Sequence, residues 1–314
     1  DSIAYTLDTK RARAEMRSQM TQAGLVRELV QRASSDRNRD TRIGHSLYQL
    51  LIPAEMDPFL GGTTEMRIKL DRGTAGIPWE LLQDERRAGG DPRPWSVRTK
   101  LMRTLITADF RRQPRDANSQ GGVLVIGEPA VPAGAGYARL PGARAEARAV
   151  ADAFAGSARD GAPGAYEAAG IKALIADADP AHAAPDAQQI INALLEREWQ
   201  VVHIAGHGAP PVPWVATPAG QTGPAPAETP GATRGVVLSH GYLGPSEIHA
   251  MRTVPELVFV NCCFLAERDA AQLLAVPNNL AQFASTVADA LINLGVRCVI
   301  AAGWAVEDGP AEVF

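Results

Sequence analysis

The fold of this chain follows from one stretch, Leu257-Val258-Phe259-Val260-Asn261-Cys262-Cys263-Phe264-Leu265-Ala266. An apolar, partly β-branched run that stops at two thiols is typical of a strand buried on both faces of a sheet. Open α/β sheets bind their ligands at the carboxyl ends of the strands, so a thiol at that end is placed for chemistry. Free cysteine is also among the most buried residue types, and packing is therefore the competing interpretation.

A second strand supplies a partner for the thiol. Val201-Val202-His203-Ile204-Ala205 ends in Gly206-His207-Gly208. A cysteine peptidase or transferase needs a thiolate, a histidine that accepts and returns its proton, and backbone donors aimed at the oxyanion. We therefore expect His207 to act as acid and base, Cys263 as the nucleophile, and the amides of Gly208 and Cys263 as oxyanion donors. Glycine after the histidine lets a substrate carbonyl approach without a Cβ in the way.

The same two strands suggest a zinc site as an alternative, with soft thiolate and imidazole ligands from His203, His207, Cys262 and Cys263. Residues four apart on a strand share a face but lie about 13 Å apart, which is too far for one metal ion. Adjacent cysteines also seldom bind one ion together. The sequence therefore predicts no metal site and no cofactor.

The segments around these strands predict a parallel sheet. Strands are expected at residues 123–127, 171–175 and 296–302 (the last of them buried). Helices are expected after Gly142 to about 154, at 187–197 and at 280–294, with a hairpin at 235–243 and a short helix from 244. The order strand, helix, strand is the signature of a parallel sheet with helices on both faces. The Pro-rich segment 209–233 and the segment 264–277 follow the two candidate catalytic strands, so we expect them to form a lid.

The first third of the chain contains no nucleophile with a base nearby and is interpreted as a structural half-domain. Its apolar spacing predicts an amphipathic helix over residues 9–33, a helix over 46–52, a strand over 66–70, and a short helix over 77–82. Residues 97–106 fit a strand or a helix. The polar linker 111–122 contains a proline and paired glycines, so we place the domain boundary there and predict domains at residues 1–118 and 119–314.

Composition and charge exclude several classes of protein. The chain has 314 residues, 31 basic and 35 acidic residues and a net charge of −4, so nothing points to nucleic acid or to an anionic membrane as a partner. No apolar run approaches the ~20 residues that span a bilayer, and no secretory leader is evident. Three cysteines, two of them adjacent, make no disulfide framework, which favours a reducing cytoplasm. Because the sequence begins at Asp1, we expect a processed product or part of a longer protein.

Several motifs together resemble the CHAT family of caspase-like peptidases. They are His203 through Gly208, Leu257 through Cys263, Gly295 through Asp308 and, in support, Leu140-Pro141-Gly142-Ala143, Gly235 through Leu238 and Ile77 through Leu82. The resemblance covers nearly the whole chain. It implies an α/β, three-layer caspase/separase-type fold with a mainly parallel sheet, preceded by a degenerate caspase-like half-domain. It also implies a histidine–cysteine dyad at His207 and Cys263.

One departure from the family pattern affects specificity. The family usually shows Ser-Ala-Cys followed by Glu-Thr-Gly, whereas this chain has Asn261-Cys262-Cys263 followed by Phe264-Leu265-Ala266. Substrate preference therefore stays open, with Asn261, Phe264 and Asp308 as candidate residues of the substrate pocket. Asp308 alternatively stabilises the last strand.

From the residues and the resemblance together we expect a cytoplasmic cysteine endopeptidase that cleaves protein substrates through a covalent thioester. A regulatory protein, or further domains of a longer chain in a bacterial defence or signalling system, is expected to activate it. The first alternative is a catalytically inactive caspase-like scaffold that binds partners. The second is a non-proteolytic α/β hydrolase or acyltransferase, for which the expected Gly-x-Ser-x-Gly element is absent.

Overall fold

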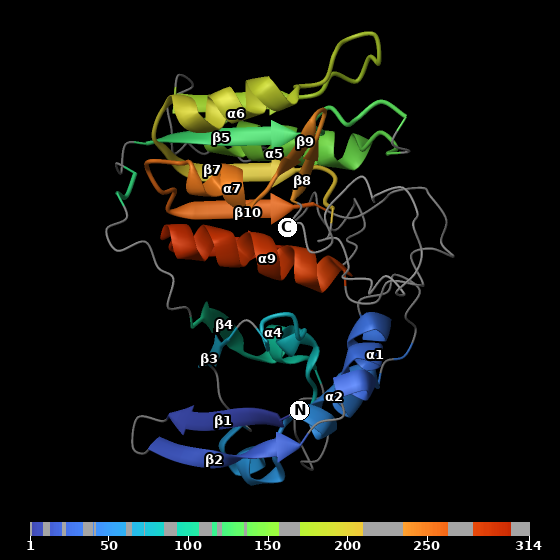
Figure 1. Ribbon diagram of the computed structural model, residues 1–314, viewed down its shortest axis with the longest axis vertical. Coiled ribbons are helices and arrows are strands. Elements are labelled where there is room, and N and C mark those ends of the chain that lie inside the picture. The colour runs from blue at the N-terminus through green and yellow to red at the C-terminus, as the bar shows by residue number, and fades with distance from the viewer. Residues whose placement is uncertain are drawn as a thin grey trace, which may run out of the picture. The chain divides into compact units, whose positions relative to one another are not determined.

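The chain forms two compact units, Asp1–Ile106 and Thr107–Phe314 (Figure 1). The predicted boundary between residues 118 and 119 lies inside the second unit, and a division into domains at that point stays a prediction. The computed structural model describes residues 2–8, 13–20, 23–33, 40, 42–60, 65–71, 73–84, 93–106, 115–117, 121–134, 137–156, 170–209, 235–262 and 279–302.

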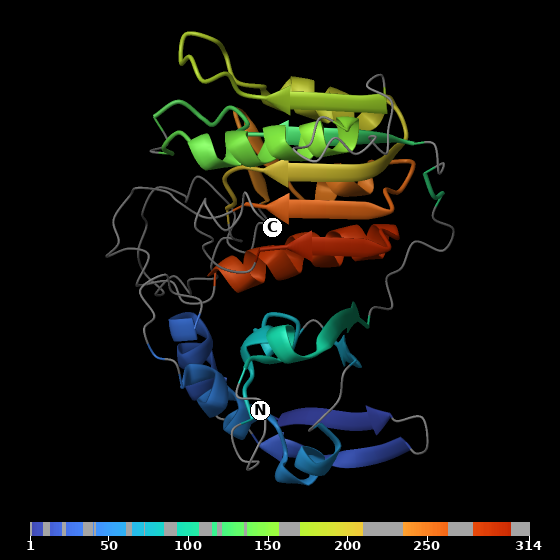
Figure 2. The ribbon, with the colours of Figure 1, turned by 180° about the vertical axis from the view of Figure 1, so that it is seen from behind.

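The second unit is built on a sheet of five parallel strands in the order β11-β10-β7-β5-β6, whose arrows point the same way in Figure 2. The strands are β5 (Gly122–Gly127), β6 (Ile171–Ile175), β7 (Trp199–Ala205), β10 (Leu257–Asn261) and β11 (Cys298–Ala301). Their apolar, largely β-branched sequences suit strands of a parallel sheet. The predicted strands of this unit are confirmed, and so is the α/β fold class with its parallel sheet.

Helices lie on both faces of this sheet. Figure 2 shows α5 (Pro141–Ala155) on one face, where Ala147 packs with Val123, Val125 and Val201. A larger core lies on the opposite face, which is the near side in Figure 1. That core is covered by α6 (Ala187–Glu196), α7 (Pro245–His249), α9 (Asn279–Leu294) and the antiparallel hairpin of β8 (Val236–Leu238) and β9 (Gly241–Leu243). The predicted helices and hairpin of this unit are confirmed.

Helix α5 packs directly on β5 because a glycine ends that strand. A Cβ on Gly127 would lie 2.4 Å from the Cβ of Ala147, so only glycine permits this approach. The helix begins with a proline in its first turn and ends at Gly156, which adopts the left-handed conformation with φ 77°. The close packing brings Glu146, the neighbour of Ala147, against the sheet, where its side chain is buried.

The strands toward the β11 edge are less buried than the sequence predicts. In β10 only Val258 and Val260 are fully buried, and the alternate residues are half-buried. β11 is the edge strand, and Cys298 and Ile300 are exposed. An edge strand has a neighbour on one side only, and α5 packs on β5, β6 and β7 rather than on β11. The prediction of a fully buried last strand is therefore wrong.

The first unit has its own hydrophobic core, which includes Leu47, Leu51, Leu82 and Trp95. Its elements are β1 (Ser2–Asp8), β2 (Arg13–Met20), α1 (Ala23–Ala33), α2 (Ile43–Leu51), η1 (Ala54–Met56), α3 (Asp57–Leu60), β3 (Glu65–Leu70), η2 (Trp79–Leu81), α4 (Trp95–Arg98) and β4 (Lys100–Leu105). Residues 97–106 contain the end of α4 and then β4, which pairs parallel with β3. Whether this unit is a degenerate caspase-like half stays a prediction.

The helix predicted over residues 9–33 is wrong in its first half. Residues 13–20 form β2, which pairs antiparallel with β1, and α1 begins only at Ala23. The apolar residues Met16 and Met20 are four apart, a spacing that fits a helix and a strand alike, because every second residue of a strand shares a face. Pairing with β1, where Ile3, Tyr5 and Leu7 pack against the core, decides for the strand.

Candidate active site

The candidate site lies at the carboxyl ends of three neighbouring strands of the second unit. The register pairs Gly127 of β5 with Ala205 of β7, and Ala205 in turn with Asn261 of β10. The pairing continues past the strand ends, because the Glu128 amide donates to the Ala205 carbonyl at 2.9 Å and the Gly206 amide to the Asn261 carbonyl at 3.1 Å. This is the edge at which parallel α/β sheets place their ligand sites.

The backbone of His207 is fixed by β8. The Val237 amide donates to the His207 carbonyl at 2.8 Å, and the Ala209 amide donates to the Gly235 carbonyl at 2.9 Å. Between these two bonds Gly208 faces Val236 in an antiparallel bridge. A residue in such a non-hydrogen-bonded pair turns its own amide away from the partner strand. The Gly208 amide is therefore directed away from β8 and does not donate to that strand.

The imidazole of His207 has a defined tautomer. Its Nε2 lies 2.8 Å from the Ala138 carbonyl, and a carbonyl can only accept, so Nε2 carries the proton. In the neutral ring Nδ1 is then the acceptor. His207 is only 2 % exposed, and Nδ1 has no partner among the residues that the structure describes. The ring of Tyr137 packs against the imidazole, with 4.8 Å between ring centroids. Nδ1 is thus the ring nitrogen of His207 that can accept a proton.

Burial also decides the charge of this histidine. Desolvation lowers the pKa of His207 below its ordinary value of 6.5, and it outweighs the opposing effects of the Ala138 carbonyl and the Glu128 carboxylate. A buried imidazole loses water around its charged form more than around its neutral form. His207 is therefore neutral at neutral pH and able to accept a proton.

Glu128 fixes the loop that carries Ala138. This carboxylate is 5 % exposed and follows β5 in the left-handed conformation with φ 51°. It accepts from the Leu140 amide at 2.9 Å, from the Arg144 guanidinium at 3.1 Å and from Arg139. Both arginines also donate to the Asp177 carbonyl, at 2.8 Å from Arg139 and 3.1 Å from Arg144. The loop from Tyr137 to Leu140 is thereby held beside His207.

A second buried carboxylate, Glu146 of α5, contacts both candidate catalytic strands. Its Oε2 accepts from the Asn261 Nδ2 at 2.7 Å, and its Oε1 lies 3.1 Å from the His203 Nε2. The latter is a close approach of two polar atoms that does not have the geometry of a hydrogen bond. His203 is 4 % exposed and stacks on Phe259 of β10, with 5.1 Å between centroids. Neither carboxylate is predicted from the sequence as part of the site. The one signal that both share is an acidic residue beside an apolar segment.

A protein-family model, the CHAT domain, matches residues 41–314, which is most of the chain and includes every residue of the site described above. The chain belongs to the CHAT domain family. CHAT domains are caspase-like and related to peptidases, so the resemblance found in the motifs is confirmed. The match begins after β1, β2 and α1 and continues through both units. No curated protein and no solved structure matched the chain.

The structure describes only some of the residues predicted for the site of this CHAT domain. His207, Gly208 and Asn261 are described, and Asn261 makes its amide hydrogen bond to Glu146. Cys262 is fully buried in the larger core with Val258 and Val260, the position of a packing residue. Outside the described residues lie Cys263, Phe264, Asp308, the segment 264–277 and all of the segment 209–233 except Ala209.

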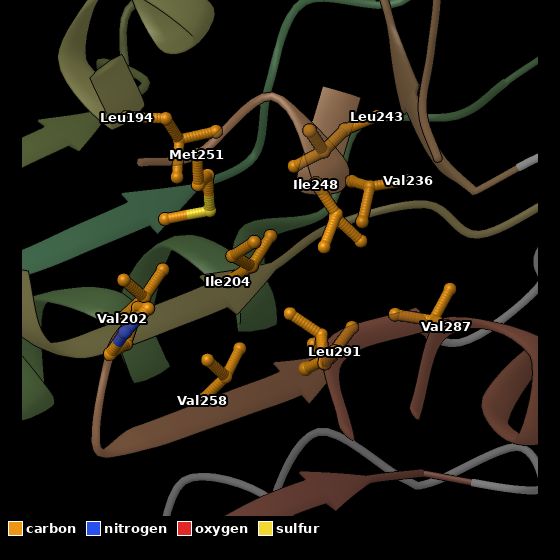
Figure 3. A pocket seen from close by; sticks show the side chains of 12 residues that line it. Leu194, Val202, Ile204, Val236, Leu243, Ile248, Met251, Val258, Val287 and Leu291 are labelled. Carbon is orange, nitrogen blue, oxygen red and sulfur yellow. The ribbon is translucent and has the colours of Figure 1, made fainter. Parts of the chain in front are cut away.

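The pocket in this CHAT domain that Figure 3 shows lies on the other face of the sheet and is a packing void. Residues of β7, β10 and α9 line it, among them Val202, Ile204, Val258 and Leu291, and its lining is wholly apolar. Its volume is about 20 Å³, close to that of one water molecule, which needs polar partners to be bound. It therefore offers no chemistry of its own.

The described ranges contain neither a cluster of metal ligands nor a helix suited to a membrane. Among these residues no three histidine, cysteine, aspartate or glutamate side chains come together as the ligands of a metal ion would. No helix in the same ranges combines the length and the apolar character needed to cross a membrane.

Proposed function

We propose that this CHAT domain is a cysteine endopeptidase in which His207 is the base and Cys263 the nucleophile. One observation carries the proposal: a buried, neutral imidazole at the sheet edge whose Nε2 proton is held by the Ala138 carbonyl and whose Nδ1 is free to accept. The strand register supports the choice of thiol. Ala205 pairs with Asn261, and counting two residues onward along each chain reaches His207 and Cys263.

The chemistry follows from these groups. Nδ1 of His207 takes the proton of the Cys263 thiol, and the thiolate attacks the carbonyl carbon of the scissile peptide bond. The amide of Gly208, which points away from β8, and that of Cys263 donate to the oxyanion that forms. The imidazolium returns its proton to the leaving amine as the C–N bond breaks, leaving a thioester. Water, deprotonated by the same imidazole, hydrolyses the thioester and restores the thiol.

The proposal extends to partners and context, on the basis of the family resemblance. A protein is the substrate, and a regulatory protein or further domains of a longer chain switch the activity on within a cytoplasmic defence or signalling system. Asn261, Phe264 and Asp308 are the proposed determinants of the cleavage site.

The test is a cleavage survey. A whole-cell protein extract is incubated with the wild-type chain and with the Cys263→Ala and His207→Ala variants, and new protein N-termini are identified by mass spectrometry. We expect each variant to cleave at least about 10³-fold more slowly than the wild-type chain, because a nucleophile and its base act as a unit. Cys298→Ala, which changes an exposed thiol, is the matched control and should cleave normally.

Three outcomes would decide between the proposed dyad and its alternatives. Wild-type cleavage by either the Cys263 or the His207 variant disproves the dyad. Loss confined to Cys262→Ala moves the nucleophile by one residue. If no protein is cleaved and an electrophilic thiol probe fails to label Cys263, the chain is an inactive scaffold that binds partners.

A further inference from the structure

A buried polar cluster joins helix α5 to the two strands that carry the proposed dyad. Its members are Glu146 of α5, His203 of β7 and Asn261 of β10. The Glu146 side chain is 7 % exposed and that of His203 5 %. Figure 2 shows α5 on this face of the sheet. Three elements that are distant in sequence thus share one buried carboxylate.

Such a carboxylate is costly for folding alone. Moving an ionised group out of water is unfavourable unless its partners compensate, and apolar residues of similar volume often stabilise a fold as well or better. A buried hydrogen bond, by contrast, restrains the two groups that make it, because displacing either one leaves a buried polar group unsatisfied. This cluster lies at the end of β10, so that strand end is the part of the structure that it restrains.

The cluster acts on the last residue of the cysteine strand. Asn261 ends β10, two residues before Cys263, and its backbone carbonyl already accepts from the Gly206 amide. Backbone pairing sets the distance between two strands but permits the strand end to twist about its own axis. The hydrogen bond from Asn261 Nδ2 to Glu146 is a second attachment on one face of β10, and the stacking of Phe259 on His203 is a third. These side-chain contacts restrain the end of β10 in addition to its backbone pairing with β7 and β11.

We propose that Glu146 is a positioning residue that fixes the carboxyl end of the cysteine strand relative to the histidine strand. The inference rests on the proposed function, because the positioned group is the Cys263 thiol. Glu146 does not touch the substrate or the reacting atoms. It acts through Asn261, and the direction of their hydrogen bond makes this role testable.

The test reverses that hydrogen bond. Asn261→Asp sets two carboxylates against each other, whereas the double variant Glu146→Gln/Asn261→Asp restores one donor and one acceptor with nearly unchanged shape. The readout is the rate at which iodoacetamide alkylates Cys263 in the intact chain, followed by peptide mass spectrometry and divided by the rate at Cys298, an exposed free thiol in the same molecule. We expect Asn261→Asp to lower this ratio by about tenfold or more, because small displacements of reacting groups have effects of this size. The double variant should recover most of it.

A melting temperature measured on each variant separates positioning from general stability. If Asn261→Asp lowers the melting temperature but leaves the alkylation ratio of the folded protein unchanged, Glu146 has a structural role only and the proposal is wrong. The proposal also fails if the double variant is unfolded or reacts as slowly as Asn261→Asp.

The proposed function has its own control in this experiment. His207→Ala should lower the same ratio in an otherwise unchanged chain. If it does not, the dyad is refuted directly. If it does and the reversed pair shows no rescue, the dyad stands and only the positioning role of Glu146 falls.

Discussion

Replacing Glu128 tests how strongly the β5–α5 loop is held beside the candidate site. Glu128→Ala removes the acceptor of the Leu140 amide and the partner of two arginines at once. The same change leaves the left-handed backbone with φ 51° in place. Glu128→Gly removes the same contacts but adds a residue that adopts this conformation without strain.

The expected loss of stability depends on how far the two arginine partners of Glu128 are exposed. The Arg139 side chain is 46 % exposed, so its pair with Glu128 contributes only about 0–1 kcal/mol. The Arg144 side chain is only 13 % exposed, so the loss of its buried partner Glu128 makes the larger contribution to the cost. Breaking a buried ion pair on one side costs about 3–5 kcal/mol, and we expect Glu128→Ala to lower the free energy of unfolding of the second unit by this amount. Glu128→Gly should cost about 1 kcal/mol less, because it relieves the left-handed strain.

Urea unfolding of the whole chain measures both variants, followed through hydrogen exchange at the amides of β5 and β7, which belong to the second unit. If Glu128→Ala lowers the free energy of unfolding by less than about 1 kcal/mol, the contacts of Glu128 are no stronger than exposed ion pairs. That result would contradict the structural role of Glu128. Equal losses for the alanine and glycine variants would contradict the argument from backbone strain, independently of the first result.

Three further predictions concern the second unit. Burial lowers the pKa of His207 below 6.5, so as the pH falls the unfolded chain takes up this proton before the folded chain does. The free energy of unfolding should therefore decrease as the pH drops below 6.5. His207→Gln should remove this part of the stability–pH profile. The acid limb of kcat/KM should likewise have its midpoint below 6.5. Leu291→Ala should cost about 2–5 kcal/mol in urea unfolding, whereas Val287→Ile, which reaches into the apolar void, should be neutral or stabilising by up to about 1 kcal/mol. Asp186 caps α6 by accepting from the Gln189 amide at 2.8 Å, so Asp186→Ala should lower the melting temperature through a loss of about 1 kcal/mol, and Asp186→Asn should be nearly neutral.

The parallel sheet could be predicted because its signal is local. Continuous apolar runs such as residues 123–127 and 257–261 form strands of the parallel sheet, although only the first of the two is buried along its whole length. The errors arose where a distant segment decides. Residues 13–20 became a strand through pairing with β1, and β11 lost its expected burial because it is the edge strand. Neither fact is encoded in the segment itself.

The candidate site divides in the same way. His207 could be identified, since a histidine between glycines after an apolar strand is a local pattern. Its partner is a backbone carbonyl, Ala138, which lies 69 residues away and has no side-chain signature at all. Glu146 and Asn261 are 115 residues apart and meet only because α5 packs on the sheet at β5, β6 and β7, next to β10. A single sequence offers no means of pairing such positions.

These contacts give the crossover from β5 to α5 a role that its sequence does not suggest. It contains no residue of the proposed dyad, yet Glu128 holds the loop whose carbonyl orients His207, and Glu146 holds the end of the cysteine strand. One continuous segment therefore contacts both the loop beside His207 and the end of β10, through two separate carboxylates. Because Glu128 acts on the histidine and Glu146 on the cysteine strand, changes at the two positions should have distinct effects: a shifted pH dependence for Glu128 and a slower thiol for Glu146. Their effects should multiply in a double variant, since the two carboxylates share no contact among the described residues.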